Sequence, residues 1–304
     1  MLKPKPLFPG ARVALVAPAG PVPPERYGPA VRALEELELR PVVFESCRRS
    51  HGYFAGSDEL RARDMNAAFA DPEIDGIFCI RGGYGAQRLM GMLDYDVIRR
   101  NPKFFAGYSD VTALHIAFNQ KCGFITYHTP MPSTELYAGV DDFTMASLKK
   151  ALFGEPFGAL RNPENLPLTT LVGGCACGTL TGGNLSLVAS SLGTPYEIDT
   201  RDKILFLEDV EEEPYRVDRM LLQLKAAGKF RDCAGILLGW WTDCTAEHPE
   251  KSLTLRQVFQ ELLVDEHKPA LMDLACGHSL PTLSLPLGSK LEINSISGKI
   301  TVLD

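Results

Sequence analysis

The chain has 304 residues, more than one compact core usually holds, so we expect two domains. Hydrophobic residues make up 45% and charged residues 23%, a balance typical of globular proteins that function in water. The formal net charge of -7, from 31 basic and 38 acidic residues, argues against a nucleic-acid-binding protein, which normally carries a basic surface.

The first half of the chain alternates between strand and helix patterns. In chain order we expect a strand at 12–17, a helix at 24–38, a strand at 41–44, a helix at 57–70 with Ser57 as its N-cap, a strand at 76–80, a helix at 86–93, a strand at 103–107, a helix at 110–119 and a strand at 123–127. Repeated β–α units of this kind favour a mostly parallel sheet with helices on both faces.

The pattern changes near residue 154. The segment 154–167 holds three prolines and two glycines and has almost no periodicity. We therefore predict an N-terminal α/β domain over 1–153, a linker over 154–169 and a smaller β-rich α+β domain over 170–304. In the second domain we expect strands at 178–180, 204–207 and 235–238, a helix at 215–227, and a final hairpin of 290–294 with 300–303.

Membrane and metal classes are disfavoured. No segment reaches the roughly 18 consecutive apolar residues typical of a membrane span, and the apolar run after Arg12 ends at once in Pro18, too short for a signal peptide. We expect a cytoplasmic protein whose eight cysteines are reduced. Cys175 with Cys177, and Cys244 with His248, are the closest approaches to a ligand pair, and neither has a second pair beside it. We expect no metal and no cofactor.

Ser109 stands where an expected apolar strand ends and an expected helix begins. This is the position of a nucleophile elbow, in which the hydroxyl is exposed and the next backbone N–H points at a developing oxyanion. The match is incomplete, because the Gly-x-Ser-x-Gly form needs glycine where this chain has Val111. The alternative is that Ser109 or Asp110 only caps the helix.

Arg81-Gly-Gly-Tyr-Gly85 also lies between a strand and a helix, where backbone amides can approach an anion. A dinucleotide fingerprint would need a third glycine where the chain has Arg88, and the phosphate-loop Lys-Ser/Thr pair is missing. Two interpretations stay open: Gly82 or Gly83 supplies an oxyanion-hole amide beside Ser109, or the segment is a plain tight turn.

Glu208 and Asp209 end an apolar strand, and His278 follows a strand-like segment in a loop. An acid there could orient a histidine, and a histidine with a pKa near neutrality suits a general base. Strand alternation does not choose between Glu208 and Asp209. His115 falls within an expected helix, where a packing role is the simpler interpretation.

Several segments together resemble the LD-carboxypeptidases (muramoyltetrapeptide carboxypeptidases), whose relatives include the microcin C immunity peptidases. In chain order these segments are Val13-Ala-Leu-Val-Ala-Pro-Ala-Gly20, Ile80-Arg-Gly-Gly-Tyr-Gly-Ala86, Gly107-Tyr-Ser-Asp110, Leu180-Thr-Gly-Gly-Asn-Leu-Ser186, Phe206-Leu-Glu-Asp-Val210, Glu213-Pro-Tyr-Arg216, Gly277-His278 and Leu285-Pro-Leu-Gly288. Each one is unspecific, but their order and spacing are specific.

The resemblance implies a catalytic triad of Ser109 as nucleophile, Glu208 as acid and His278 as general base. It places the oxyanion hole at the backbone N–H of Asp110 and of Gly82 or Gly83. The implied reaction is hydrolysis of the bond between the L-centre of a diamino acid and a C-terminal D-alanine in murein tetrapeptides, in cell-wall peptide recycling. Family members are commonly homodimers without a cofactor.

Two further positions follow from the resemblance and the reaction. Relatives usually have glycine after the histidine where this chain has Thr129, so we expect the backbone of that loop to differ and assign it no role in shaping the substrate pocket. Arg81 is a candidate for binding the terminal carboxylate, with a structural ion pair as the alternative. The rival functions are the same triad acting on a peptidyl acyl-adenylate conjugate, a nucleotide-binding two-domain protein, and a non-catalytic two-lobed ligand-binding protein.

Overall fold

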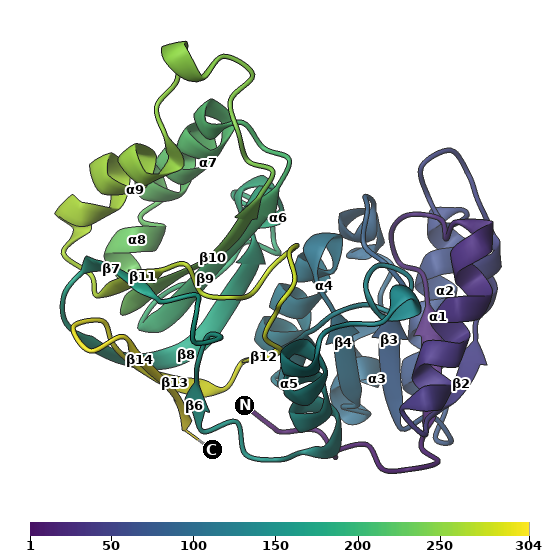
Figure 1. Ribbon diagram of the computed structural model, residues 1–304. Coiled ribbons are helices and arrows are strands. Elements are labelled where there is room, and N and C mark those ends of the chain that lie inside the picture. Colours follow the sequence, from purple (N-terminus) through teal and green to yellow (C-terminus); the bar gives the residue numbers. More distant parts are fainter. Residues whose placement is uncertain (304) are drawn as a thin grey trace. The chain divides into compact units, whose positions relative to one another are not determined.

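The computed structural model describes residues 1–303 and divides into two compact units. The first unit comprises residues 1–155 together with 284–287, and the second comprises 156–283 together with the chain from 288 onward. A short strand from the rear of the chain thus belongs to the front unit. Figure 1 shows both units.

The first unit is built on a six-stranded sheet in the order β12-β5-β4-β3-β1-β2. Its strands are β1 (Arg12–Val16), β2 (Arg40–Val43), β3 (Gly76–Cys79), β4 (Phe104–Gly107), β5 (Thr126–His128) and β12 (Leu285–Leu287). The first five run parallel, and β12 pairs antiparallel with β5. Central strands β3 and β4 are buried along their whole length, as expected for a sheet covered on both faces. The expectation of a mostly parallel first sheet is confirmed.

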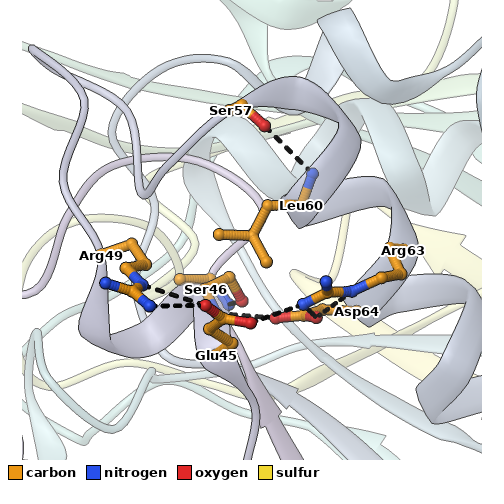
Figure 2. A network of polar contacts seen from close by, with 8 residues as sticks. Glu45, Ser46, Arg49, Ser57, Leu60, Arg63 and Asp64 are labelled. Atoms are coloured by element: carbon orange, nitrogen blue, oxygen red, sulfur yellow. Dashed lines mark hydrogen bonds and ion pairs between the residues drawn. The ribbon is translucent and has the colours of Figure 1, made fainter.

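Five α-helices and several short 3₁₀ turns accompany this sheet. They are α1 (Pro24–Glu36), α2 (Asp58–Ala70), α3 (Tyr95–Arg100), α4 (Thr112–Ala117) and α5 (Asp142–Phe153), with η1 (Glu45–Arg48), η2 (Ala86–Leu89) and η3 (Ser109–Val111) among the turns. The Ser57 hydroxyl accepts the Leu60 N–H at 3.3 Å and so caps α2, as predicted. Further along α2, the Asp64 carboxylate accepts the Ser46 N–H at 2.6 Å and joins this helix to η1 (Figure 2).

Two expected helices differ from the pattern in form and length. Only the 3₁₀ turn η2 forms within the expected helix 86–93, because Asp94 caps a new helix through the N–H groups of Asp96 and Val97. The expected helix 110–119 begins as η3, continues as α4 and ends in a π-helical turn, η4 (Phe118–Cys122). Gly123 closes that turn in the left-handed region with φ +76°, so β5 begins only at Thr126.

The second unit is built on an eight-stranded mixed sheet in the order β6-β14-β13-β8-β9-β10-β11-β7. Its strands are β6 (Ala159–Leu160), β7 (Thr169–Val172), β8 (Cys175–Asn184), β9 (Lys203–Val210), β10 (Gly235–Thr242), β11 (Ala270–Met272), β13 (Lys290–Asn294) and β14 (Lys299–Leu303). Strands β8 to β11 run parallel, and β13 and β14 form the predicted antiparallel hairpin. The expected β-rich α+β character is confirmed.

Four helices follow the parallel strands of this unit: α6 (Leu185–Ser190), α7 (Pro214–Ala226), α8 (Lys229–Asp232) and α9 (Leu255–Leu263). They lie together beside the sheet in Figure 1. The inward face of α7 consists of Val217, Leu221 and Leu224, all fully buried, which is the apolar face its 3.6-residue spacing predicts. Along residues 1–303, no helix combines the length and the apolar character that crossing a membrane requires.

Candidate active site

Ser109 lies at the carboxyl end of β4 as the first residue of η3. Its φ is +65°, in the left-handed region that a residue with a side chain rarely adopts. Such strain concentrates at functional sites, where the surrounding structure holds the residue in place. The side chain is half-buried.

Gly82 packs directly against this serine. A Cβ added to Gly82 would lie 2.9 Å from Ser109 Cβ, 3.0 Å from Ser109 Oγ and 3.5 Å from the Asp110 amide nitrogen. Gly83, by contrast, faces the loop after β1, because its Cβ would lie 3.2 Å from the Cα of Gly20. The structure therefore brings Gly82, Ser109 and the Asp110 amide together, and it turns the open side of Gly83 elsewhere.

The side chain of Asp110 is buried and accepts the Ala86 N–H at 2.6 Å. Burial raises the pKa of this carboxyl to about 6, while hydrogen bonds from the amides of Ala86 and Gly85 and the charge of Arg61 act in the opposite direction. The residue after the serine thus contributes a polar side chain that sequence reasoning assigned only to helix capping. An acid directly after a candidate nucleophile and opposite a glycine-rich turn was the available signal.

His115 is fully buried in α4, and its Nε2 lies 2.8 Å from the carbonyl oxygen of Gly107, the last residue of β4. The carbonyl oxygen accepts, so Nε2 carries a proton. Burial lowers the pKa of His115 to about 4. His115 therefore holds the strand end that carries Ser109, which refines the packing role expected from its helical position.

In the second unit, Glu208 and His278 are hydrogen-bonded. Glu208 Oε2 lies 2.6 Å from His278 Nδ1; the carboxylate side chain is fully buried and the imidazole is 12% exposed. Glu208 belongs to β9, and His278 lies in the loop after β11. Gly277 permits the contact: its φ is +139°, and a Cβ there would lie 3.0 Å from Glu208 Oε2. This geometry orients an imidazole and stabilises its cation.

Asp209, the other member of the acidic pair, points to different partners. Its Oδ2 accepts the backbone N–H and the hydroxyl of Ser186, and its Oδ1 accepts the Asn184 side-chain amide at 2.8 Å. Burial, and next the charge of Glu208, raise the pKa of Asp209. Asp209 thereby secures the junction of β8 and α6, a role that sequence analysis did not foresee; the Asn184-Leu-Ser186 helix-start pattern was the signal for it.

The remaining candidates have simpler surroundings. Arg81 Nη1 donates to the Pro21 carbonyl oxygen at 2.9 Å, and burial, with the charge of Arg26, lowers the pKa of its guanidinium. The Thr129 side chain is buried, and its backbone N–H donates to Gly107 at 3.2 Å. Within residues 1–303, no three or more His, Cys, Asp and Glu side chains are grouped so that they could hold a metal ion.

The structure thus divides the predicted triad. Ser109, Asp110 and Gly82 are assembled in the first unit, and Glu208 with His278 in the second. The first part holds a serine with a strained backbone packed against Gly82, and the second holds an imidazole backed by a buried carboxylate. The triad as a whole stays a prediction.

Comparisons with known proteins bear on both parts. Residues 13–129 match the model of the LD-carboxypeptidase N-terminal domain, and residues 177–293 match that of the LD-carboxypeptidase C-terminal domain. The chain is 44% identical to a probable murein peptide carboxypeptidase of Bacillus subtilis, over 96% of this chain and 92% of the relative.

Solved structures agree over nearly the whole chain. The microcin C7 self-immunity protein MccF in complex with glutamyl sulfamoyl guanosine superposes with a TM-score of 0.92 at 26% identity, covering 100% of this chain and 99% of that one. A muramoyltetrapeptide carboxypeptidase from Oxalobacter formigenes superposes with a TM-score of 0.82 at 29% identity, covering 96% and 98%. The resemblance read from the motifs is confirmed: the chain belongs to the LD-carboxypeptidase family of peptidases.

Proposed function

We propose that this protein is a serine-type LD-carboxypeptidase that releases D-alanine from murein tetrapeptides. The observation that carries the proposal is the 2.6 Å contact between Glu208 and His278, because it prepares a general base of the kind that an acyl-transfer serine requires. Family membership supports the reaction class, and the murein peptide carboxypeptidase relative from Bacillus subtilis supports the substrate.

In this mechanism the Ser109 hydroxyl attacks the carbonyl carbon of the bond that joins the diamino acid to the terminal D-alanine. Nδ1 of His278 is held by Glu208, so Nε2 takes the serine proton. The tetrahedral intermediate collapses when the same nitrogen protonates the leaving amine. A water molecule, deprotonated by His278, then hydrolyses the acyl-enzyme and restores the serine. Catalysis requires that the two units bring hydroxyl and imidazole together.

The oxyanion would be stabilised by the backbone N–H of Asp110 and by an amide of the glycine loop. Contact of Gly82 with Ser109 supports Gly82 over Gly83 as that donor. Losing one such donor typically costs about 100- to 1000-fold in kcat. The mechanism uses no metal and no cofactor, so activity should persist in EDTA.

A second candidate is cleavage of peptidyl acyl-adenylate conjugates by the same triad. The TM-score of 0.92 with MccF bound to glutamyl sulfamoyl guanosine favours it. The two functions share their chemistry and differ in the leaving group, which is D-alanine in one and the nucleotide phosphate, or the sulfamate nitrogen of a sulfamoyl analogue, in the other.

A substrate panel separates the two candidates. Purified protein is given a tetrapeptide ending in D-alanine, its diastereomer ending in L-alanine, and an aminoacyl sulfamoyl adenosine. The proposal expects release of the terminal alanine from the first peptide and not from its diastereomer. Ser109→Ala should release none from either peptide. Hydrolysis of the sulfamoyl adenosine alone would transfer the assignment to the second candidate. We also propose that the protein is cytoplasmic and forms a homodimer. Sedimentation at several concentrations tests the oligomeric state.

A further inference from the structure

The glycine loop between β3 and η2 is fixed at both ends. At its start, the Gly82 carbonyl oxygen accepts the Gly20 N–H at 3.0 Å. At its end, the Gly85 carbonyl oxygen accepts from Arg61 Nη1 at 3.0 Å. The loop therefore has two anchors, one at Gly82 beside the serine and one at Gly85.

The Asp110 carboxylate supplies the rest of the second anchor. It accepts the Ala86 N–H at 2.6 Å, and the Gly85 amide also hydrogen-bonds to it. Arg61 thus holds the carbonyl of Gly85 while Asp110 holds its amide. Both side chains are 1% exposed, so water cannot easily replace either partner.

Gly85 itself leaves little alternative to this arrangement. Its φ is +123°, and an added Cβ would lie 2.6 Å from the Phe54 ring and 2.8 Å from Arg61 Nη1. The peptide is confined by the ring, the guanidinium and the carboxylate together. Any loosening at Asp110 would be transmitted along three residues to Gly82, which lies against Ser109.

We propose that the Asp110 side chain is a positioning group: in its ionised form it holds the loop from Gly82 to Gly85 against Ser109, and its protonation releases that hold and slows acylation. The inference rests on the proposed function of Ser109 as nucleophile. It adds an acid-sensitive control on the oxyanion side of the site, distinct from the Glu208–His278 pair.

The chemistry of the carboxyl group explains the sensitivity. An ionised carboxylate offers only acceptors to the two amides, whereas a protonated one carries an O–H on one oxygen and accepts hydrogen bonds more weakly. The pKa of Asp110 is raised to about 6, so this change falls within an ordinary pH range. Two titratable groups interact with it: the Arg61 guanidinium of α2, which favours ionisation, and the Cys79 thiol of β3. The pKa of Cys79 is raised well above its usual value by burial, so that thiol stays neutral. Gly85 and Ala86 contribute backbone amides.

Asp110→Asn tests the inference, because the amide matches the carboxylate in shape but turns an NH₂ toward one donor. The readouts are kcat and KM for D-alanine release, and the rate of Ser109 labelling by a fluorophosphonate, each from about pH 5 to about pH 8. We expect kcat and the labelling rate to fall by about 10- to 100-fold and KM to change little. The component of the pH dependence that has its midpoint near 6, the pKa of Asp110, should disappear.

Asp64→Asn is the matched control. Asp64 is also a buried acid that accepts a backbone N–H at 2.6 Å, from Ser46, but it lies in the α2–η1 network of Figure 2. It should keep the wild-type pH profile. Wild-type rates and profile in Asp110→Asn would overturn the inference. An equal loss in Asp64→Asn would also overturn it, because the effect would then follow from any buried acid.

The wild-type protein provides a second test that needs no variant. In a pH titration followed by ¹⁵N–¹H spectra, the amide resonances of Gly85 and Ala86 should shift together with a midpoint near 6, the pKa of Asp110. Constant shifts through that range would contradict the inference. If Ser109 is labelled with the expected pH dependence but no D-alanine is released, the positioning role stands and the proposed substrate fails.

Discussion

Glu208 Oε2 and His278 Nδ1 are 2.6 Å apart, with the carboxylate completely buried on β9 and the imidazole on a loop after β11. The two residues are 70 positions apart in the sequence, and parallel pairing of β9, β10 and β11 brings their segments to neighbouring strand ends. The contact places the ring proton on Nδ1 and presents Nε2 for proton transfer. In the proposed mechanism this pair supplies the general base and the acid that orients it.

Glu208→Gln tests the importance of this pair for catalysis. The amide preserves the shape of the side chain but cannot stabilise the imidazolium, and it can favour the wrong tautomer. We expect kcat to fall by about 10³- to 10⁴-fold with a small change in KM. Steady-state release of D-alanine measures the effect, and an unaltered kcat would remove Glu208 from the mechanism.

Asp209→Ala should act on stability instead. The change removes the acceptor of the Ser186 N–H and of the Asn184 amide, which are held inside the junction of β8 and α6. We expect the free energy of unfolding to fall by about 1–3 kcal/mol in urea. Glu208→Gln, which keeps the shape of the side chain, is the comparison. If its unfolding free energy falls more than that of Asp209→Ala, the assignment of Glu208 to catalysis and Asp209 to stability is incorrect.

Gly82→Ala places a methyl group 2.9 Å from Ser109 Cβ and 3.0 Å from its Oγ. Gly82 does not lie in the left-handed region, so the backbone should accept alanine, and the expected effect is displacement of the hydroxyl or of the oxyanion amide. We expect kcat to fall by about 100-fold or more, with a near-normal melting temperature. Gly91→Ala is the control, because a Cβ there meets nothing within 4 Å.

The buried His115 predicts how stability depends on pH. Its pKa is lowered from 6.5 to about 4 in the folded protein, so the unfolded chain binds more protons between those values. The unfolding free energy contributed by this residue is present above pH 6.5 and is lost as the pH falls toward 4, by at most about 3 kcal/mol.

Urea unfolding of the wild type and of His115→Gln at several pH values measures this contribution. The glutamine can still donate to the Gly107 carbonyl but does not titrate, so the stability of the wild type relative to the variant should decrease in acid. His248→Gln, at a side chain that is 67% exposed, should track the wild type throughout. A pH-independent difference for His115→Gln would show that the folded protein tolerates the charged ring.

The parallel sheet and the terminal hairpin could be predicted because their signals are local. Buried strands such as β3 and β4 are uninterrupted apolar runs. Buried and exposed side chains alternate along β13 and β14, which a short turn joins. Helices α5 and α9 were not predicted, although Asp141 caps the first and a Thr254–Gln257 capping box begins the second. Strand β12 could not be predicted, since it pairs with β5 across more than 150 residues of sequence.

The sequence predicted which residues form the candidate site but not the contacts that hold them in place. The motifs pointed to Ser109 and His278, and strand alternation left Glu208 and Asp209 equivalent until the family resemblance chose Glu208. In the structure Glu208 contacts His278, whereas Asp209 binds Ser186. The Asp110 anchor depends on a loop from another β–α unit. The acid beside the candidate nucleophile was a signal, but residue spacing does not show that its side chain reaches that loop.

The most direct test of the account is where a serine-directed fluorophosphonate attaches. Intact-protein mass spectrometry with peptide mapping should find one adduct, on Ser109, and its formation should abolish D-alanine release. Ser133 is a buried serine whose hydroxyl donates a hydrogen bond to the Ile80 carbonyl oxygen, so Ser133→Ala should be labelled like the wild type. Ser109→Ala should be neither labelled nor active. Turnover by Ser109→Ala, or an inactivating adduct on any other residue, would contradict the claim that this hydroxyl is the nucleophile.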